Sequence, residues 1–127
     1  MYLFPGEEAL FSPPPVGMQV EKSCFCSPAG HPVPIVLCRP YCDRRFRPLA
    51  CRIFPLFPYI TPAGDLSVRM DPRGRGICPL AGVMNVSDLD PAFVSKVRYL
   101  GKLLVRLSVM RQYLYDLSRL IDETILF

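Results

Sequence analysis

A segment dense in cysteine, proline and arginine limits what this chain can fold into more than any other feature. Cys38, Cys42 and Cys51 follow one another with the spacing C-x3-C-x8-C, and Cys78 comes after two nearby glycines. Thiolates brought together in this way form the tetrahedral cage that a soft metal ion needs. We therefore predict that Cys38, Cys42, Cys51 and Cys78 form one metal site.

The composition sets the context for these thiols. The chain has 127 residues, six cysteines and fifteen prolines, and its mean hydropathy is +0.24. This length predicts a single domain over residues 1–127, with a cysteine-rich part of loops and strands (1–88) and a helical part (89–127). We see no secretion signal and no apolar run of about 20 residues that could span a bilayer, so we expect a cytoplasmic protein. In a reducing compartment, cysteines more often serve metal or redox chemistry than disulfides.

The identity of the metal stays open at this point. The C-x3-C spacing is looser than that of a zinc knuckle, so zinc and an iron–sulfur cluster both remain candidates. The residues considered as further ligands are Cys24, Cys26 and His31. For Cys24 and Cys26, packing in the core or beside the site is an equal alternative, because cysteine is often buried. For His31, the alternative is a surface turn.

The apolar pattern predicts an α+β fold. Residues 33–37 form an apolar run that predicts a strand leading into Cys38. Residues 56–60 and 66–70 predict a hairpin with a five-residue loop, in which Pro58 requires an edge strand or a packed extended segment. Residues 7–11 predict a short helical turn.

A helical pattern begins at Asp90, which predicts an N-cap followed by proline at the first helical position. Apolar residues recur at helical spacing with one slip of phase, which indicates one long helix or two helices broken near Ser108. The predicted buried stripe consists of Phe93, Val97, Leu100, Leu104, Leu107, Met110, Leu114, Leu117, Ile121 and Ile125.

The charge pattern says little about partners. The formal net charge is +4, which permits an acidic partner or nucleic acid without arguing for either. We expect the arginines at 39, 44, 45, 47 and 52 to offset the negative charge of the thiolates. The acidic residues are scattered, so we expect no catalytic residue and no bound organic cofactor, and we leave open whether the chain is an enzyme. The expected partner is a metal ion, with room for a protein partner, rather than nucleic acid or a membrane.

One motif carries a family resemblance. Residues 47–55 read R-P-L-A-C-R-I-F-P, which resembles the R-P-x-x-C-R-x-F-P signature of the YkgJ-like cysteine-cluster proteins, a family described as zinc- or iron-chelating. Cys42 is similar to the cysteine that precedes that signature. M-Y-L-F-P-G-E-E at residues 1–8, M-D-P-R at 70–73 and I-C-P-L at 77–80 resemble a bacterial branch of this family.

The resemblance also implies two alternatives. The family's CxxCxxCC cluster usually precedes the segment that matches residues 1–8 and does not occur in this sequence. Either the chain is N-terminally short, or this member binds its metal with fewer ligands. Related flagellin lysine methylases share the cysteine pattern, which makes a protein lysine N-methylase-like enzyme one alternative function. A nucleic-acid-binding zinc module, with Arg44, Arg45, Arg47 and Arg52 on one face, is another.

Overall fold

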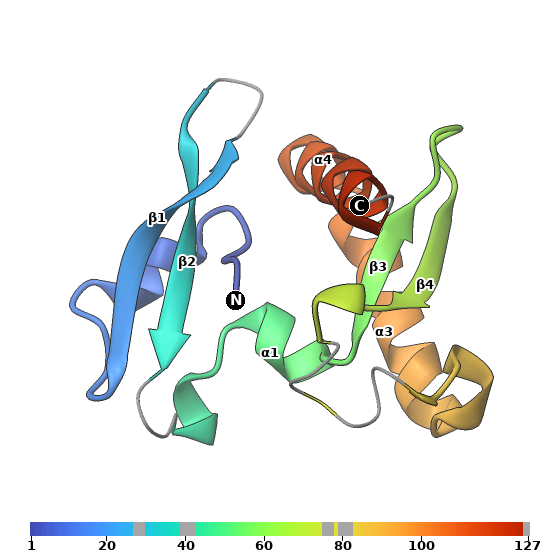
Figure 1. Cartoon of the computed structure of the whole chain (residues 1–127), viewed down its shortest axis with the longest axis horizontal. Coiled ribbons are helices and arrows are strands. Elements are labelled where there is room, and N and C mark those ends of the chain that lie inside the picture. Colours follow the sequence, from blue (N-terminus) through green and yellow to red (C-terminus); the bar gives the residue numbers. More distant parts are fainter. Residues whose placement is uncertain (27–29, 39–42, 75–77, 79–82, 126–127) are drawn as a thin grey trace. The chain divides into compact units, whose positions relative to one another are not determined.

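The chain divides into two compact units, Met1–Arg52 and Ile53–Phe127, each described in turn. The structure, a computed structural model, describes residues 1–26, 30–38, 43–74, 78 and 83–125. Its elements are two antiparallel hairpins, several short helical turns and two longer helices (Figure 1). The predicted α+β class is therefore confirmed. The boundary between the two units lies between Arg52 and Ile53. The predicted division into a cysteine-rich part (1–88) and a helical part (89–127) instead separates the strands from the long helices.

The first unit is built on the hairpin of β1 (Met18–Cys26) and β2 (Pro32–Cys38). Their register runs from Met18↔Cys38 to Lys22↔Pro34 and shifts before Cys26↔Pro32. The predicted strand over residues 33–37 is confirmed within β2.

The N-terminal segment lies along the other edge of β2. Leu3 N donates to Pro34 O (2.9 Å), and Val36 N donates to Met1 O (2.9 Å). Leu3, Phe11, Met18 and Val36 form a buried cluster at this edge. Phe11 ends the helical turn η1 (Glu7–Phe11), which the sequence predicts. The first unit continues through η2 (Arg44–Phe46) to the one-turn helix α1 (Leu49–Ile53) at the unit boundary.

The second unit begins with the predicted hairpin, β3 (Leu56–Ile60) paired with β4 (Leu66–Met70) across the loop at 61–65. Asp71 N donates to Pro55 O (2.7 Å), and Thr61 N donates to Asp65 O (2.8 Å). In this register the backbone N–H and C=O groups of the odd-numbered residues of β3 face β4. The nitrogen of Pro58 therefore faces away from β4, where the missing N–H costs no ladder hydrogen bond. This confirms the prediction of an edge strand.

Two helices cover this hairpin, α3 (Pro91–Leu104) and α4 (Ser108–Ile125). Asp90 Oδ1 accepts a hydrogen bond from Ala92 N (2.9 Å), and Pro91 occupies the first turn, as the sequence predicts. The helical pattern breaks before Ser108, so the two-helix alternative is the correct one. The short turns η3 (Pro72–Gly74) and η4 (Val86–Asp88) complete the unit.

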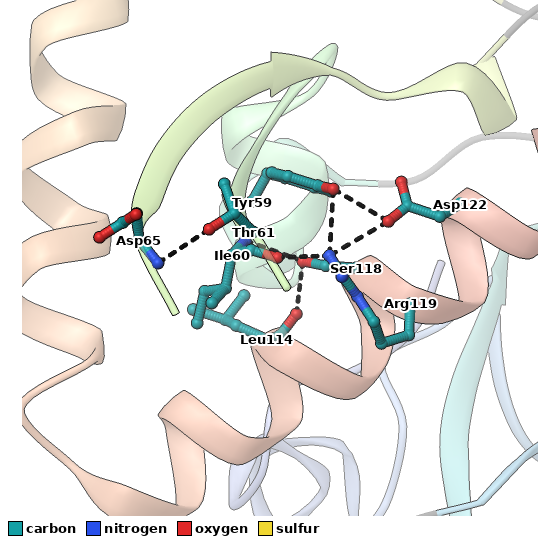
Figure 2. Close-up of polar contacts among 8 residues, drawn as sticks. All are labelled: Tyr59, Ile60, Thr61, Asp65, Leu114, Ser118, Arg119 and Asp122. Carbon is teal, nitrogen blue, oxygen red and sulfur yellow. Dashed lines mark hydrogen bonds and ion pairs between the residues drawn. The ribbon is translucent and has the colours of Figure 1, made fainter. Parts of the chain in front are cut away.

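Side chains of α4 satisfy the outer edge of β3, as Figure 2 shows. Ser118 Oγ accepts from Ile60 N (3.0 Å) and donates to Leu114 O (2.6 Å), while Arg119 donates to Ile60 O (2.6 Å). The same guanidinium reaches the hydroxyl of Tyr59 (3.0 Å), which lies 2.9 Å from Asp122 Oδ2. A buried strand edge needs partners for its backbone groups, and α4 supplies them at Ile60.

The buried face of α3 matches the prediction in part. Val97 is buried as predicted, while Val94 and Gly101 are buried and the predicted Phe93, Leu100 and Leu104 are half-buried. Leu107 lies beyond α3 and is 56% exposed. A Cβ atom built on Gly101 would lie 3.2 Å from Pro58 Cβ and 3.2 Å from Leu66 Cδ2. The absence of a side chain at Gly101 therefore lets α3 approach the hairpin closely. In α4 the predicted Leu114, Leu117 and Ile121 are buried.

A bilayer crossing needs a helix that is both long and apolar, and none of the helices in the described parts of the chain meets that requirement.

Candidate metal site

The first predicted ligand stands at the end of β2. Cys38 pairs in register with Met18 and is exposed, while Met18 itself is buried in the core of the first unit. The strand therefore fixes the backbone of Cys38 at the border between core and solvent. The next predicted ligand, Cys42, lies outside the described residues.

The segment that follows is organised by its own charges. Asp43 accepts hydrogen bonds from Arg45 N (2.9 Å) and from the Arg45 guanidinium (2.7 Å at the shortest). The hydrogen bonds from the side chain and the backbone of Arg45 lower the pKa of Asp43 to about 2, and the carboxylate raises the pKa of Arg45 in return. The guanidinium also lies 5.5 Å from the ring centre of Phe46. Arg45 thus has a local partner within the segment.

Arg52, the residue after Cys51, ties the same segment together. Its Nε donates to Arg47 O (2.9 Å), and its second guanidinium nitrogen donates to Arg45 O (3.0 Å). Arg52, the arginine of the C-R-I-F-P sequence, therefore stabilises this segment, because it donates hydrogen bonds to two backbone carbonyls that need a partner. We predicted that the arginines offset thiolate charge; for Arg45 and Arg52 the structure adds hydrogen bonds that stiffen the segment.

Cys51 lies on α1, which is anchored at its start. Cys51 N donates to Pro48 O (3.0 Å), and Pro48 is fully buried. Leu49 N donates to Glu7 Oε1 (2.8 Å), and the other oxygen of Glu7 accepts from Phe4 N (2.7 Å). The backbone that carries Cys51 is therefore held by the N-terminal segment, while the cysteine itself is half-buried.

Glu7 is the residue that sequence reasoning missed. It counted as one of several scattered acids, although it lies in the motif at residues 1–8. Nothing in the order of residues indicates that its carboxylate reaches the backbone at residue 49. The bond joins the two motifs on which the family resemblance depends.

Cys78 belongs to the second unit and is held by a turn after β4. Its N–H donates to Gly74 O (2.9 Å), and Gly74 N donates to Asp71 O (3.1 Å). Asp71 is only 2% exposed and forms a two-pronged ion pair with Arg73 (2.8 and 2.5 Å). A buried carboxylate needs such a partner, so the M-D-P-R sequence builds the turn that leads to Cys78, which is half-buried.

The lesser candidates lie at the far end of the first hairpin. Cys24 and Cys26 are both exposed on β1, and His31 is exposed just before β2. Packing in the core, one of the alternatives for these two cysteines, therefore does not apply. They flank the buried Phe25, so the outward positions of an alternating strand fall on the cysteines.

Among the residues that the structure describes, the predicted ligands are not grouped into a metal site. In the described ranges, which include Cys38, Cys51 and Cys78 but not Cys42, no three His, Cys, Asp or Glu side chains are grouped as a metal would require. The predicted set draws on both units. Its four-cysteine arrangement therefore stays a prediction.

No family model, no curated protein and no solved structure matches this chain.

Proposed function

We propose that this chain binds zinc or an iron–sulfur cluster through the thiolates of Cys38, Cys42, Cys51 and Cys78. Four thiolates close the coordination sphere, so the metal would stabilise the fold or carry electrons rather than activate water. We also propose that the chain belongs to the YkgJ-like family, as its sequence motif suggests, and that it is cytoplasmic, as its composition suggests.

The observation that carries this proposal is the exposure of the cysteines. Of the five in the described part of the chain, three are exposed and two are half-buried, and none is fully buried. Cysteine is ordinarily among the most buried residue types, so core packing does not account for these side chains. A role for the sulfur atoms themselves is the better explanation.

The build of the segment around Cys51 gives further support. Hydrogen bonds from Leu49 to Glu7 and from Arg52 to two carbonyls fix the backbone on both sides of the cysteine. Metal sites depend on such supporting contacts, which hold a ligand in position before the ion arrives. The turn closed by Asp71 and Arg73 does the same for Cys78.

The test is metal analysis of the full chain purified without added metal. We expect a stoichiometric metal in the unmodified protein and its loss in Cys51→Ser. Cys24→Ser is the matched control, since it removes an exposed thiol outside the proposed set. Brown colour and absorbance near roughly 400 nm would identify an iron–sulfur cluster, and colourless zinc-containing protein would identify zinc.

Far-ultraviolet circular dichroism of each variant separates loss of a ligand from loss of the fold. Metal that is absent from the unmodified protein, or that remains at full occupancy in a folded Cys51→Ser variant, would refute the proposal.

A further inference from the structure

The exposed end of β1 presents two thiols on one face. Cys24 and Cys26 are exposed, whereas Phe25 between them is buried and its ring lies 5.4 Å from that of Tyr2. Side chains alternate along a strand, so residues on either side of an inward one point outward together. Cys24 and Cys26 therefore share the solvent face.

The backbone that carries the two thiols is fixed. Ser23 Oγ donates to Val33 O (2.6 Å) on β2 and accepts from Phe25 N (3.2 Å). Cys26 stays in register with Pro32 after the shift in the ladder. Between Lys22 and Cys26, where the strand register shifts, the Ser23 hydroxyl thus takes the place of regular backbone hydrogen bonds between β1 and β2. The strand therefore keeps both cysteines in position.

The side chain of Cys26 leans back toward Cys24. Its Sγ lies 3.9 Å from Cys24 O, close enough for a weak thiol hydrogen bond. The Sγ atom of Cys26 therefore lies close to the backbone of Cys24, on the same side of the strand as the Cys24 thiol.

We propose that Cys24 and Cys26 form a second metal site, separate from the Cys38–Cys78 set, that binds a soft monovalent ion such as copper(I). Two residues apart, the Cα atoms of a strand lie about 6.5–7 Å apart, which is at the upper end of what a disulfide tolerates. A bridging ion with metal–sulfur bonds of roughly 2.3 Å spans such a pair more easily.

The number of ligands favours copper(I) over zinc. Zinc requires about four ligands, and in the described ranges no third His, Cys, Asp or Glu side chain joins this pair into a metal-binding group. Soft thiolates favour copper(I), zinc and iron–sulfur clusters, and among these copper(I) is the one that two thiolates alone can bind. On binding, each thiol releases one proton and forms one copper–sulfur bond, so copper stays monovalent and no electron is transferred.

The experiment is a titration of the full chain with copper(I) under anaerobic conditions, in competition with bicinchoninate. The variants are Cys24→Ser, Cys26→Ser and the double variant. A chelating pair loses its ion when either thiol is removed. We therefore expect each single variant to bind about one equivalent less than the unmodified protein, and the double variant to lose no more than either single one. Lys22→Ser changes the same exposed strand without removing a thiol and should bind as the unmodified protein does.

Equal copper binding by the unmodified protein and the double variant would overturn the proposal, as would single losses that add up in the double variant. The zinc or iron content of the protein purified without added metal distinguishes this site from the proposed function. We expect Cys24→Ser to keep that metal, and its loss from a folded variant would show one shared site instead of two.

Discussion

Glu7 accepts a hydrogen bond from the backbone N–H of Leu49 at 2.8 Å, across 42 residues of sequence. The carboxylate thereby caps the turn that carries Cys51, and its other oxygen holds the N–H of Phe4 (2.7 Å). One acidic side chain thus connects the N-terminal segment to the C-R-I-F-P segment.

Glu7→Gln should destabilise the first unit. Glutamine offers one acceptor oxygen where two N–H groups need partners, so its NH₂ group would face one of them. Hydrogen bonds to charged groups contribute about 1.5–3 kcal/mol, and we expect a loss of that order in the free energy of unfolding measured with urea. Glu8→Gln is the control, because Glu8 is exposed and should change stability by less than about 0.5 kcal/mol. Equal effects of the two variants would contradict this role of Glu7.

Asp43 should titrate far below an ordinary aspartate. Its pKa is lowered from 3.8 to about 2 by Arg45, so the folded segment favours the charged carboxylate. The resulting stabilisation is complete above about pH 4 and is lost as the pH falls through about 2. Carboxyl carbon NMR can follow this titration. Arg45→Gln should raise the pKa of Asp43 toward its ordinary value and Arg44→Gln should not; an unchanged titration in Arg45→Gln would rule out the assigned cause.

Ser118→Ala should destabilise the second unit. Ser118 is fully buried, and its hydroxyl is the acceptor for Ile60 N at the outer edge of β3. A buried N–H without an acceptor costs about 1–3 kcal/mol, and we expect thermal or urea unfolding to show a loss in that range. Ser95→Ala removes an exposed hydroxyl from α3 and serves as the control. A stability of Ser118→Ala equal to that of the control would mean that another group, or water, satisfies Ile60.

Gly101→Val should prevent the close approach of α3 to the hairpin. Even a Cβ at this position would lie 3.2 Å from Pro58 Cβ and Leu66 Cδ2, and valine adds two further carbons. Overpacking of this kind costs about 1–3 kcal/mol, which urea unfolding can measure. Lys102→Val places the same side chain on the exposed neighbour and should cost less than about 1 kcal/mol, since only helix propensity changes. A Gly101→Val protein as stable as Lys102→Val would show that α3 does not pack as described.

Local signals in the sequence predict most of the helices and strands. The features that they fail to predict depend on tertiary contacts. The hairpin of β3 and β4, the Asp90 cap and the break before Ser108 each depend on a few neighbouring residues, and all three are confirmed. The strand β1 continues to Cys26, although Glu21, Lys22 and Ser23 form a polar run without apolar alternation. Pairing with β2 and the Ser23 hydroxyl make this segment a strand.

The candidate site shows the same division. Cysteine spacing and the neighbouring arginines identify the segment from Cys38 to Arg52. The carboxylate of Glu7 holds the backbone of this segment at Leu49, a contact that sequence order does not reveal. The buried pair of Asp71 and Arg73 holds the turn before Cys78 in the second unit. The predicted stripe of α3 omitted Gly101 for a related reason, because the small size of Gly101 matters only once the helix meets Pro58.

X-ray absorption at the metal edge tests the central claim most directly. The full chain, purified without added metal, is measured at the zinc and iron edges, and the fit gives the number and type of the nearest atoms. Our account predicts about four sulfur neighbours at roughly 2.3 Å, with a nearby second iron if the site is a cluster. A shell of oxygen and nitrogen atoms, or a protein that holds neither metal, would contradict it.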